Sequence, residues 1–179
     1  MNELEFPATP EIIFGDFHYF DADEELICIS KYIKEKTTHN ADIDPARIKY
    51  LYTDKMQKDG GRYTVGHLII RSDLEKMVDD IYDYIIVVNY EIWKDLDNHN
   101  KIIQFDKILC GIDLGTLDSP SLKKKATDSR EYIDNLNFFG ATSVLESSEL
   151  VNLAAQRIVD KKKEDRKIAK ELRTVNHYE

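Results

Sequence analysis

The sequence predicts a small α+β protein with a long, charged helix at its C-terminal end. Three observations carry this prediction. The chain has 179 residues, a length that suits one domain. Short apolar or alternating stretches typical of strands occur at 47–53, 62–71 and 84–88, between stretches with helical periodicity. A helical pattern then begins near residue 147 and continues to about 174, and its second half is almost entirely charged.

Composition limits the classes of function. The net charge is −9, with 24 acidic against 13 basic residues in 1–120 and 10 against 12 in 121–179. Because phosphate attracts basic surfaces, the acidic body argues against direct binding of nucleic acid. No apolar run approaches the roughly 20 residues that span a bilayer. The two cysteines, Cys28 and Cys110, lie in apolar stretches without a Cys-x-x-Cys spacing, so we expect two buried free thiols in a reducing cytoplasm.

The N-terminal half is expected to contain one helix and a strand hairpin. Residues 1–20 read as an extended arm packed on the body, and 21–37 as a helix capped by Asp21 or Asp23. The strands at 47–53 and 62–71 flank a Gly60-Gly61 turn, which suggests a β-hairpin or meander.

The remaining elements are expected to be mainly helical. Ser72 can cap a short helix to residue 80, and 84–88 is apolar enough for a strand buried on both faces. A helix at 96–110 has its apolar stripe on Ile102, Phe105, Leu109 and Ile112. A basic loop at 120–125, a helix from 127 or 128 to 139, and the long helix from 147 follow. We expect a body at 1–145, including the arm at 1–20, and a C-terminal helix at 146–179.

Familiar catalytic motifs do not occur in the sequence. It has neither a phosphate-binding glycine loop nor a Gly-x-Ser-x-Gly elbow. No two of the five histidines lie four residues apart, so no helix offers a ready pair of zinc ligands; they are His18, His39, His67, His99 and His177. Adjacent acids such as Asp79-Asp80 are typical of solvated faces, rather than of a general acid–base pair.

Several segments, in order and spacing, resemble the phage metallopeptidase family. They are Arg-Ile-Lys-Tyr-Leu-Tyr at 47–52, Gly-Gly-Arg at 60–62, Asp-Tyr-Ile-Ile-Val-Val at 83–88, Trp-Lys-Asp-Leu at 93–96, Cys-Gly-Ile-Asp at 110–113 and Arg-Glu-Tyr at 130–132, followed by a glycine at 140. The resemblance, which covers about residues 24–140, implies a small zincin-like domain with a three- to four-stranded sheet packed against helices. It also implies a helix that carries His-Glu-Leu-x-His just before the Cys-Gly pair.

The zinc motif of that family is missing here. Its histidine positions fall on Phe105 and Leu109, its glutamate on Asp106, and a later acidic position on Glu131. Neither hydrocarbon side chain has a lone pair for a metal, and aspartate is shorter than glutamate. Burial of Phe105 and Leu109 in the space that the metal and its ligands would occupy would stabilise the fold by about 1.5–3 kcal/mol for each side chain. We therefore expect no metal, no cofactor and no peptidase activity, whether or not this helix derives from a zinc helix.

Three classes of function remain open. The first is a non-catalytic protein that binds a host or phage protein, as an inhibitor or adaptor in counter-defence or host takeover. The second is a divergent metal-dependent hydrolase that uses Asp106 and Glu131. The third is a structural protein that self-associates through its C-terminal helix. The candidate partner-binding residues are the basic side chains of that helix, Lys161, Lys162, Lys163, Arg166, Lys167 and Lys170.

Overall fold

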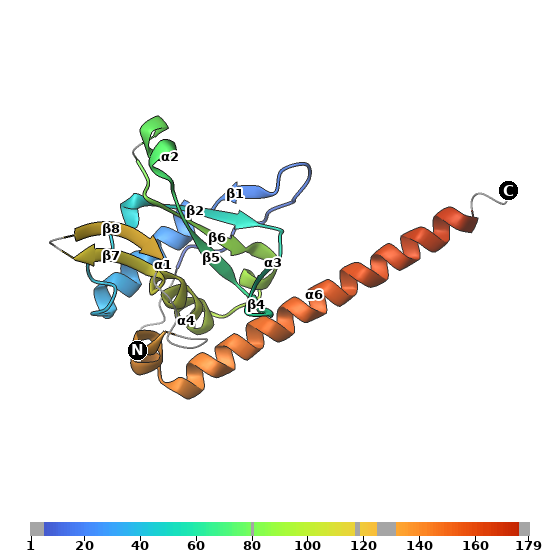
Figure 1. Cartoon of the computed structure of the whole chain (residues 1–179). Helices are drawn as coiled ribbons and strands as arrows, with labels where there is room; N and C mark the ends of the chain where they lie inside the picture. The colour runs from blue at the N-terminus through green and yellow to red at the C-terminus, as the bar shows by residue number, and fades with distance from the viewer. Residues whose placement is uncertain (1–5, 80, 117–118, 125–131, 176–179) are drawn as a thin grey trace.

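A four-stranded mixed sheet forms the centre of the protein (Figure 1). The structure is a computed structural model that describes residues 6–79, 81–116, 119–124 and 132–175. The strand order is β1 (Tyr19–Asp21), β2 (Ile48–Thr53), β6 (Tyr84–Asn89) and β5 (Gly66–Ile70). β2 and β6 run parallel, whereas β1 and β5 pair antiparallel with their neighbours. The α+β class and the sheet of up to four strands are confirmed.

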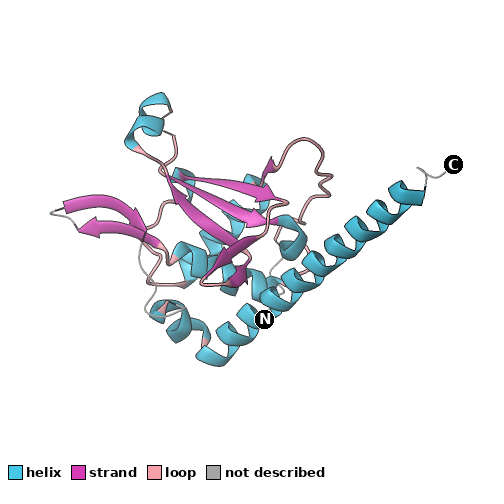
Figure 2. Cartoon of the chain, turned by 45° about the vertical axis from the view of Figure 1, so that its right-hand side comes forward, coloured by secondary structure: helices cyan, strands magenta, loops and turns pink. Residues whose placement is uncertain are grey.

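Two small ribbons and several helices complete the fold (Figure 2). The ribbons pair β3 (Gln57–Asp59) with β4 (Arg62–Thr64), and β7 (Ile112–Thr116) with β8 (Ser119–Lys124). The helical elements are α1 (Asp23–Lys36), the 3-10 turn η1 (Pro45–Arg47), α2 (Asp73–Val78), α3 (Tyr90–Trp93), α4 (Asn98–Leu109), α5 (Ile133–Phe139) and α6 (Ala141–Val175).

The core lies between one face of the sheet and helices α1 and α4. Alternation along β2 places Ile48, Tyr50 and Tyr52 on this face, opposite residues of β6 such as Ile86, and all four side chains are at most 2% exposed. β6 is buried along most of its length, as its apolar run predicted. The N-terminal arm packs against the same core: the Tyr90 hydroxyl donates to the Pro10 carbonyl at 2.8 Å and accepts from the Ile12 amide at 3.1 Å.

Several local predictions are wrong in instructive ways. The segment 62–71 does not pair with β2: it divides into β4, which pairs with β3, and β5, which pairs with β6. The predicted hairpin required a free edge of β2, and β2 instead pairs in parallel with β6 along that edge. The N-cap of α1 is Ala22, and Asp21 instead accepts a bond from the Asp23 amide. Residues 119–124 form strand β8 rather than a loop, and Ile112 lies in β7 rather than on the helical stripe.

Two of the predicted helix ends are confirmed. Ser72 and Glu75 form the reciprocal capping box at the start of α2. Gly140, with φ of 84°, ends α5 as predicted; the expected caps of that helix at 127–128 lie outside the described residues. The C-terminal helix begins at Ala141 rather than near 147, so its first turns belong to the body.

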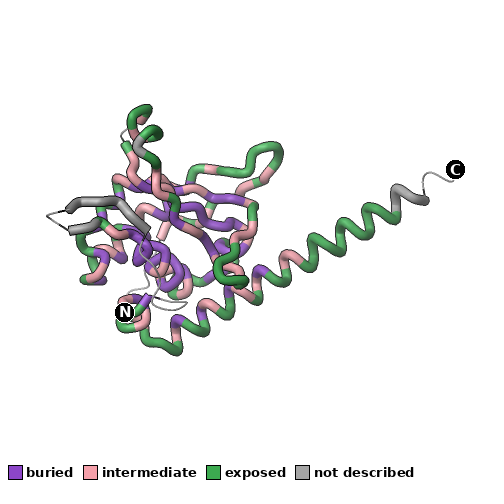
Figure 3. Tube along the Cα trace, viewed as in Figure 1, coloured by how far each residue is buried: buried purple, intermediate pink, exposed green. Residues whose placement is uncertain are grey.

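Helix α6 divides into a packed half and a projecting half (Figure 3). Val144, Ser147, Val151 and Ala155 are buried against the body at helical spacing, where α6 contacts α3, α4, α5 and β4. Every residue from 160 to 171 is exposed. The predicted charged projection is therefore present as a continuous helix that extends beyond the body.

Candidate functional site

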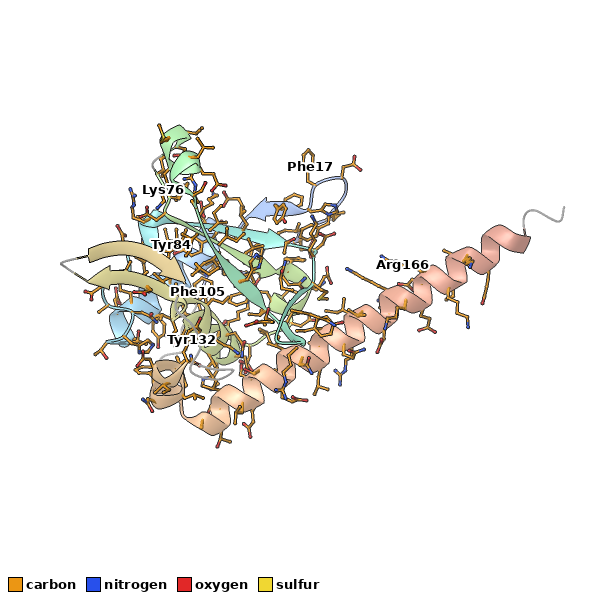
Figure 4. All side chains as sticks on the ribbon, viewed as in Figure 1. Phe17, Lys76, Tyr84, Phe105, Tyr132 and Arg166 are labelled. Atoms are coloured by element: carbon orange, nitrogen blue, oxygen red, sulfur yellow. The ribbon has the colours of Figure 1, made fainter. Side chains whose placement is uncertain are left out.

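Phe105 and Leu109, the positions at which the sequence resemblance would place zinc-binding histidines, are part of the hydrophobic core. Phe105 is fully buried and Leu109 is 1% exposed. The Phe105 ring lies 6.0 Å from that of Tyr50 and 5.9 Å from that of Trp93, at the centre of the body (Figure 4). These hydrocarbon side chains offer no donor atom, so the residues present do not fit the zinc site of the metallopeptidase family.

Asp106, the next residue of α4, is the centre of a buried polar cluster. Its side chain is fully buried and accepts hydrogen bonds from three neighbours. The Nε2 atom of His39 lies 3.0 Å from Oδ1, the Nδ2 atom of Asn40 lies 2.7 Å from Oδ1, and the Nδ2 atom of Asn135 lies 2.7 Å from Oδ2. The Cys110 thiol lies 3.6 Å from Oδ2. We refer to these five residues as the Asp106 cluster.

Three parts of the chain supply the cluster. Asp106 and Cys110 are four residues apart, so they share one face of α4 at its C-terminal end. His39 and Asn40 lie in the loop after α1, where the Ile43 amide donates to the Asn40 carbonyl at 3.2 Å. Asn135 comes from α5. The Phe138 ring, also on α5, meets the His39 ring edge-on at 6.0 Å.

The cluster unites three kinds of metal-ligating atom. One imidazole nitrogen of His39, one carboxylate oxygen of Asp106 and the sulfur of Cys110 all lie within 4.8 Å of one another. His39 also lines a cavity of about 270 Å³, together with Asp42, Ile43, Ile112, Asp113 and Leu114. An imidazole, a carboxylate and a thiol can hold a metal ion or can stabilise the fold as a hydrogen-bonded group.

A second buried carboxylate connects the N-terminal arm to the core. Glu25 is 2% exposed and accepts from the Lys101 ammonium at 2.7 Å, from the Trp93 indole at 3.0 Å and from the Thr9 hydroxyl at 2.9 Å. The Tyr52 hydroxyl also donates to it. Burial, and then the hydrogen bond to Glu25, raise the pKa of Tyr52 far above its usual range. Because four donors surround the buried carboxylate, we expect this cluster to contribute to stability.

A larger cavity of about 560 Å³ lies apart from both carboxylates. It is bordered by the β3–β4 ribbon, β5, α4 and α6, and its polar lining includes Lys58, His67, Gln104, Lys107 and Tyr132. Gln104 is held by its Nε2 atom, which donates to the Ser147 hydroxyl of α6 at 3.0 Å. The cavity therefore borders the packed half of α6, and it does not reach the Asp106 cluster.

The structure brings together only part of the predicted site. Asp106 is at its centre, whereas Glu131 lies outside the described residues. The six basic candidates, Lys161, Lys162, Lys163, Arg166, Lys167 and Lys170, are all exposed on the projecting half of α6. The Cys110 thiol is buried as expected, whereas Cys28 is half-buried, and neither forms a disulfide in the described part of the chain.

Sequence reasoning missed three members of the cluster. His39, Asn40 and Asn135 are 67, 66 and 29 residues from Asp106 along the chain. No local spacing connects residues so far apart. The one available signal was an aspartate whose neighbours at helical spacing, Ile103 and Leu109, are apolar, since an acid buried on such a face requires nearby donors.

Comparisons with known proteins leave this chain without a match. No protein-family model matches it. No curated protein and no solved structure matches it either. Among the described residues, no helix is long and apolar enough to cross a membrane.

Proposed function

We propose that this chain is a non-catalytic binding protein that holds an acidic protein partner, of host or phage origin, on the projecting half of α6. The observation that carries the proposal is the exposure of every residue from 160 to 171 in a helix of 35 residues. Isolated helical segments are marginally stable in water, because ordering the backbone costs entropy that only packing offsets. A partner that packs along this half would supply the missing contacts.

The charge of the projecting half indicates the chemistry of that partner. Residues 160–171 contain six basic and four acidic side chains, whereas the chain as a whole carries −9. Asp160 accepts from Lys163 at 3.2 Å and from Gln156 at 3.0 Å, so part of its charge is neutralised within the helix. The remaining basic groups, with Arg166 among them (Figure 4), suit an acidic surface.

A second exposed feature favours a protein partner over nucleic acid. Helix α2 stands away from the sheet (Figure 1), and its Leu74, Met77 and Val78 side chains are 73%, 85% and 85% exposed. Ile81, three residues after Val78, is 60% exposed. Apolar side chains grouped in this way are typical of protein–protein contacts, whereas they add nothing to phosphate binding.

The absence of peptidase chemistry is part of the proposal. Its support is the burial of Phe105 and Leu109 where the family motif has zinc ligands. The alternative of a divergent hydrolase has less support, because both oxygens of Asp106 already accept hydrogen bonds from His39, Asn40 and Asn135. A general base needs a free oxygen that reaches the attacking water.

Charge reversal on α6 tests the proposal. A variant with Lys161, Lys162, Arg166 and Lys167 changed to Glu is compared with the full chain and with Lys31→Glu, an exposed lysine on α1. Each protein is immobilised, and binding partners from infected and uninfected host lysate are quantified. We expect the full chain and Lys31→Glu to retain the same partners, and the recovered amount of these partners to be at least about tenfold lower on the charge-reversed variant. The bound partners should elute as the salt concentration rises. Equal recovery on all three proteins would refute the α6 surface.

Self-association through α6 is the alternative outcome. In that case the full chain would show a multiple of the 20.9 kDa chain mass in light scattering. A version that ends at residue 159 would return to the monomer mass. A monomeric full chain would exclude the assembly role and leave the partner-binding role in place.

A further inference from the structure

We propose that His39, Asp106 and Cys110 form a binding site for zinc or a similar thiophilic divalent cation. This inference is independent of partner binding through α6. It also departs from the expectation drawn from the sequence, in which the loss of the two motif histidines implied no metal. The proposed ligands are a different set, gathered from the loop after α1 and from the end of α4.

The donor atoms already lie close to the spacing that such an ion requires. With Zn–N and Zn–O bonds of about 2.0 Å and Zn–S bonds of about 2.3 Å, tetrahedral ligand atoms are about 3.3–3.5 Å apart. Here His39 Nε2 lies 3.0 Å from Asp106 Oδ1, and Cys110 Sγ lies 3.6 Å from Asp106 Oδ2. All three donors fit within 4.8 Å of one another. The two distances to Asp106 are therefore near the separation that one ion requires, and the remaining gap would have to close on binding.

The identity of the ligands selects the class of metal. A thiolate is a poor ligand for Mg²⁺ and Ca²⁺, which prefer oxygen donors, and a good one for zinc. Thiolate, carboxylate and neutral imidazole together carry two negative charges, which a divalent cation balances. That balance matters because the Asp106 side chain is fully buried and the His39 side chain is only 12% exposed.

Two asparagines supply the outer support that metal-binding carboxylates usually have. Asn40 and Asn135 each donate to Asp106 at 2.7 Å, one to each oxygen. Asn135 is itself fully buried, and its Oδ1 atom has no hydrogen-bond partner in the described part of the chain. Buried acceptors are rarely left unpaired. A water held as the fourth zinc ligand would be a donor suited to this acceptor.

The site would add a metal link between the loop after α1 and helix α4, which His39 and Asn40 already join through Asp106. His39 also lines the cavity of about 270 Å³. Binding would tie the loop after α1 to the C-terminal end of α4, and it would stabilise the folded state in proportion to the logarithm of metal concentration. We therefore expect the bound metal to stabilise the fold.

Metal binding to the full-length protein tests the site directly. The chain is stripped with a chelator and titrated with Zn²⁺, bound metal is measured by mass spectrometry, and thermal unfolding is followed in parallel. We expect about one zinc per chain and a higher unfolding temperature with zinc. Titration with Co²⁺ should produce the absorption band of a cobalt–thiolate bond, which reports the Cys110 ligand specifically.

Matched variants locate the ligands. Cys110→Ser and His39→Gln should each weaken zinc binding by more than about tenfold, and Cys110→Ser should abolish the cobalt–thiolate band. The controls are Cys28→Ser, a thiol outside the cluster, and His18→Gln, which removes a histidine paired with Asp54 at 3.0 Å. Both controls should bind zinc like the unmodified chain.

Two results would overturn the proposal. One is a folded full-length protein that binds less than about a tenth of an equivalent of zinc and shows no cobalt–thiolate band. The other is a band that survives in Cys110→Ser but disappears in Cys28→Ser. Should a cluster variant fail to fold, the band in the unmodified chain and in Cys28→Ser still decides the question.

Discussion

Lys101 and Glu25 form an ion pair inside the core, with the ammonium nitrogen 2.7 Å from a carboxylate oxygen and side-chain exposures of 9% and 2%. Lys101 lies on α4 and Glu25 on α1, so the pair joins the two helices that cover the sheet. The same ammonium lies 5.3 Å from the centre of the Trp93 ring and donates to the Thr9 hydroxyl at 2.7 Å. One lysine thus connects α1, α3 and the N-terminal arm.

Removing that lysine should destabilise the protein severely. We expect Lys101→Met to lower the free energy of unfolding by about 3–5 kcal/mol, because Glu25 would keep a buried charge without its cation. The matched control is Lys94→Met, which breaks a pair with Glu91 at 2.9 Å whose members are 38% and 32% exposed. That change should cost at most about 1 kcal/mol. Urea unfolding measures both, and equal losses would contradict a special role for the buried pair.

Phe105 should behave as a core residue, because its ring fills the space between the sheet and α3. Phe105→Ala is expected to lose about 3–5 kcal/mol of stability through lost contacts and the cavity left behind. Phe17→Ala provides the comparison, since that ring is 76% exposed and projects from the loop before β1 (Figure 4). Its loss should change the unfolding free energy by less than about 0.5 kcal/mol. Comparable values for the two would place Phe105 outside the core.

Gly66 is required by the close approach of two strands. A Cβ atom there would lie 2.5 Å from the Val87 carbonyl oxygen and 3.1 Å from the Ile108 side chain. We expect Gly66→Ala to cost about 1–3 kcal/mol, because β5 and β6 would have to separate locally. Gly15→Ala meets nothing within 4 Å and should be neutral or slightly stabilising, as alanine restricts the unfolded chain. Thermal unfolding of both variants checks this difference.

The Arg47–Asp83 pair should make stability depend on pH in the acidic range. Arg47 donates to both carboxylate oxygens, at 2.8 and 3.0 Å, and these bonds lower the pKa of Asp83 below its ordinary value of 3.8, against the opposing effect of partial burial. A carboxyl group whose pKa is lowered by folding stabilises the folded state at pH values above its ordinary pKa. This contribution is lost as the pH falls through the pKa of the folded state.

Asp83→Asn measures that contribution. At pH 7 the variant should be less stable by about 1 kcal/mol, a modest figure because Arg47 is 40% exposed. The difference should shrink as pH drops below 3.8. Asp165→Asn, an exposed change on α6, should show no such convergence. A gap between Asp83→Asn and the unmodified protein that is constant from pH 7 to about pH 2 would refute the assignment.

The sequence by itself predicted the strands and helix ends that depend on interactions between residues close in the chain. The alternating residues of β2 and the apolar run of β6 indicated strands, and the Ser72–Glu75 box marked the start of α2. The charged second half of α6 indicated a projecting helix. Periodicity and capping act over a few residues, so a single sequence carries them in full.

Only the tertiary structure decided which elements meet. The parallel pairing of β2 with β6 excluded the predicted hairpin, because a strand has two edges and β1 and β6 take both edges of β2. In the same way, His39 and Asn135 reach Asp106 only when the loop after α1 and helix α5 converge on α4. Contacts between residues dozens of positions apart depend on how the whole core packs, and no local pattern encodes them.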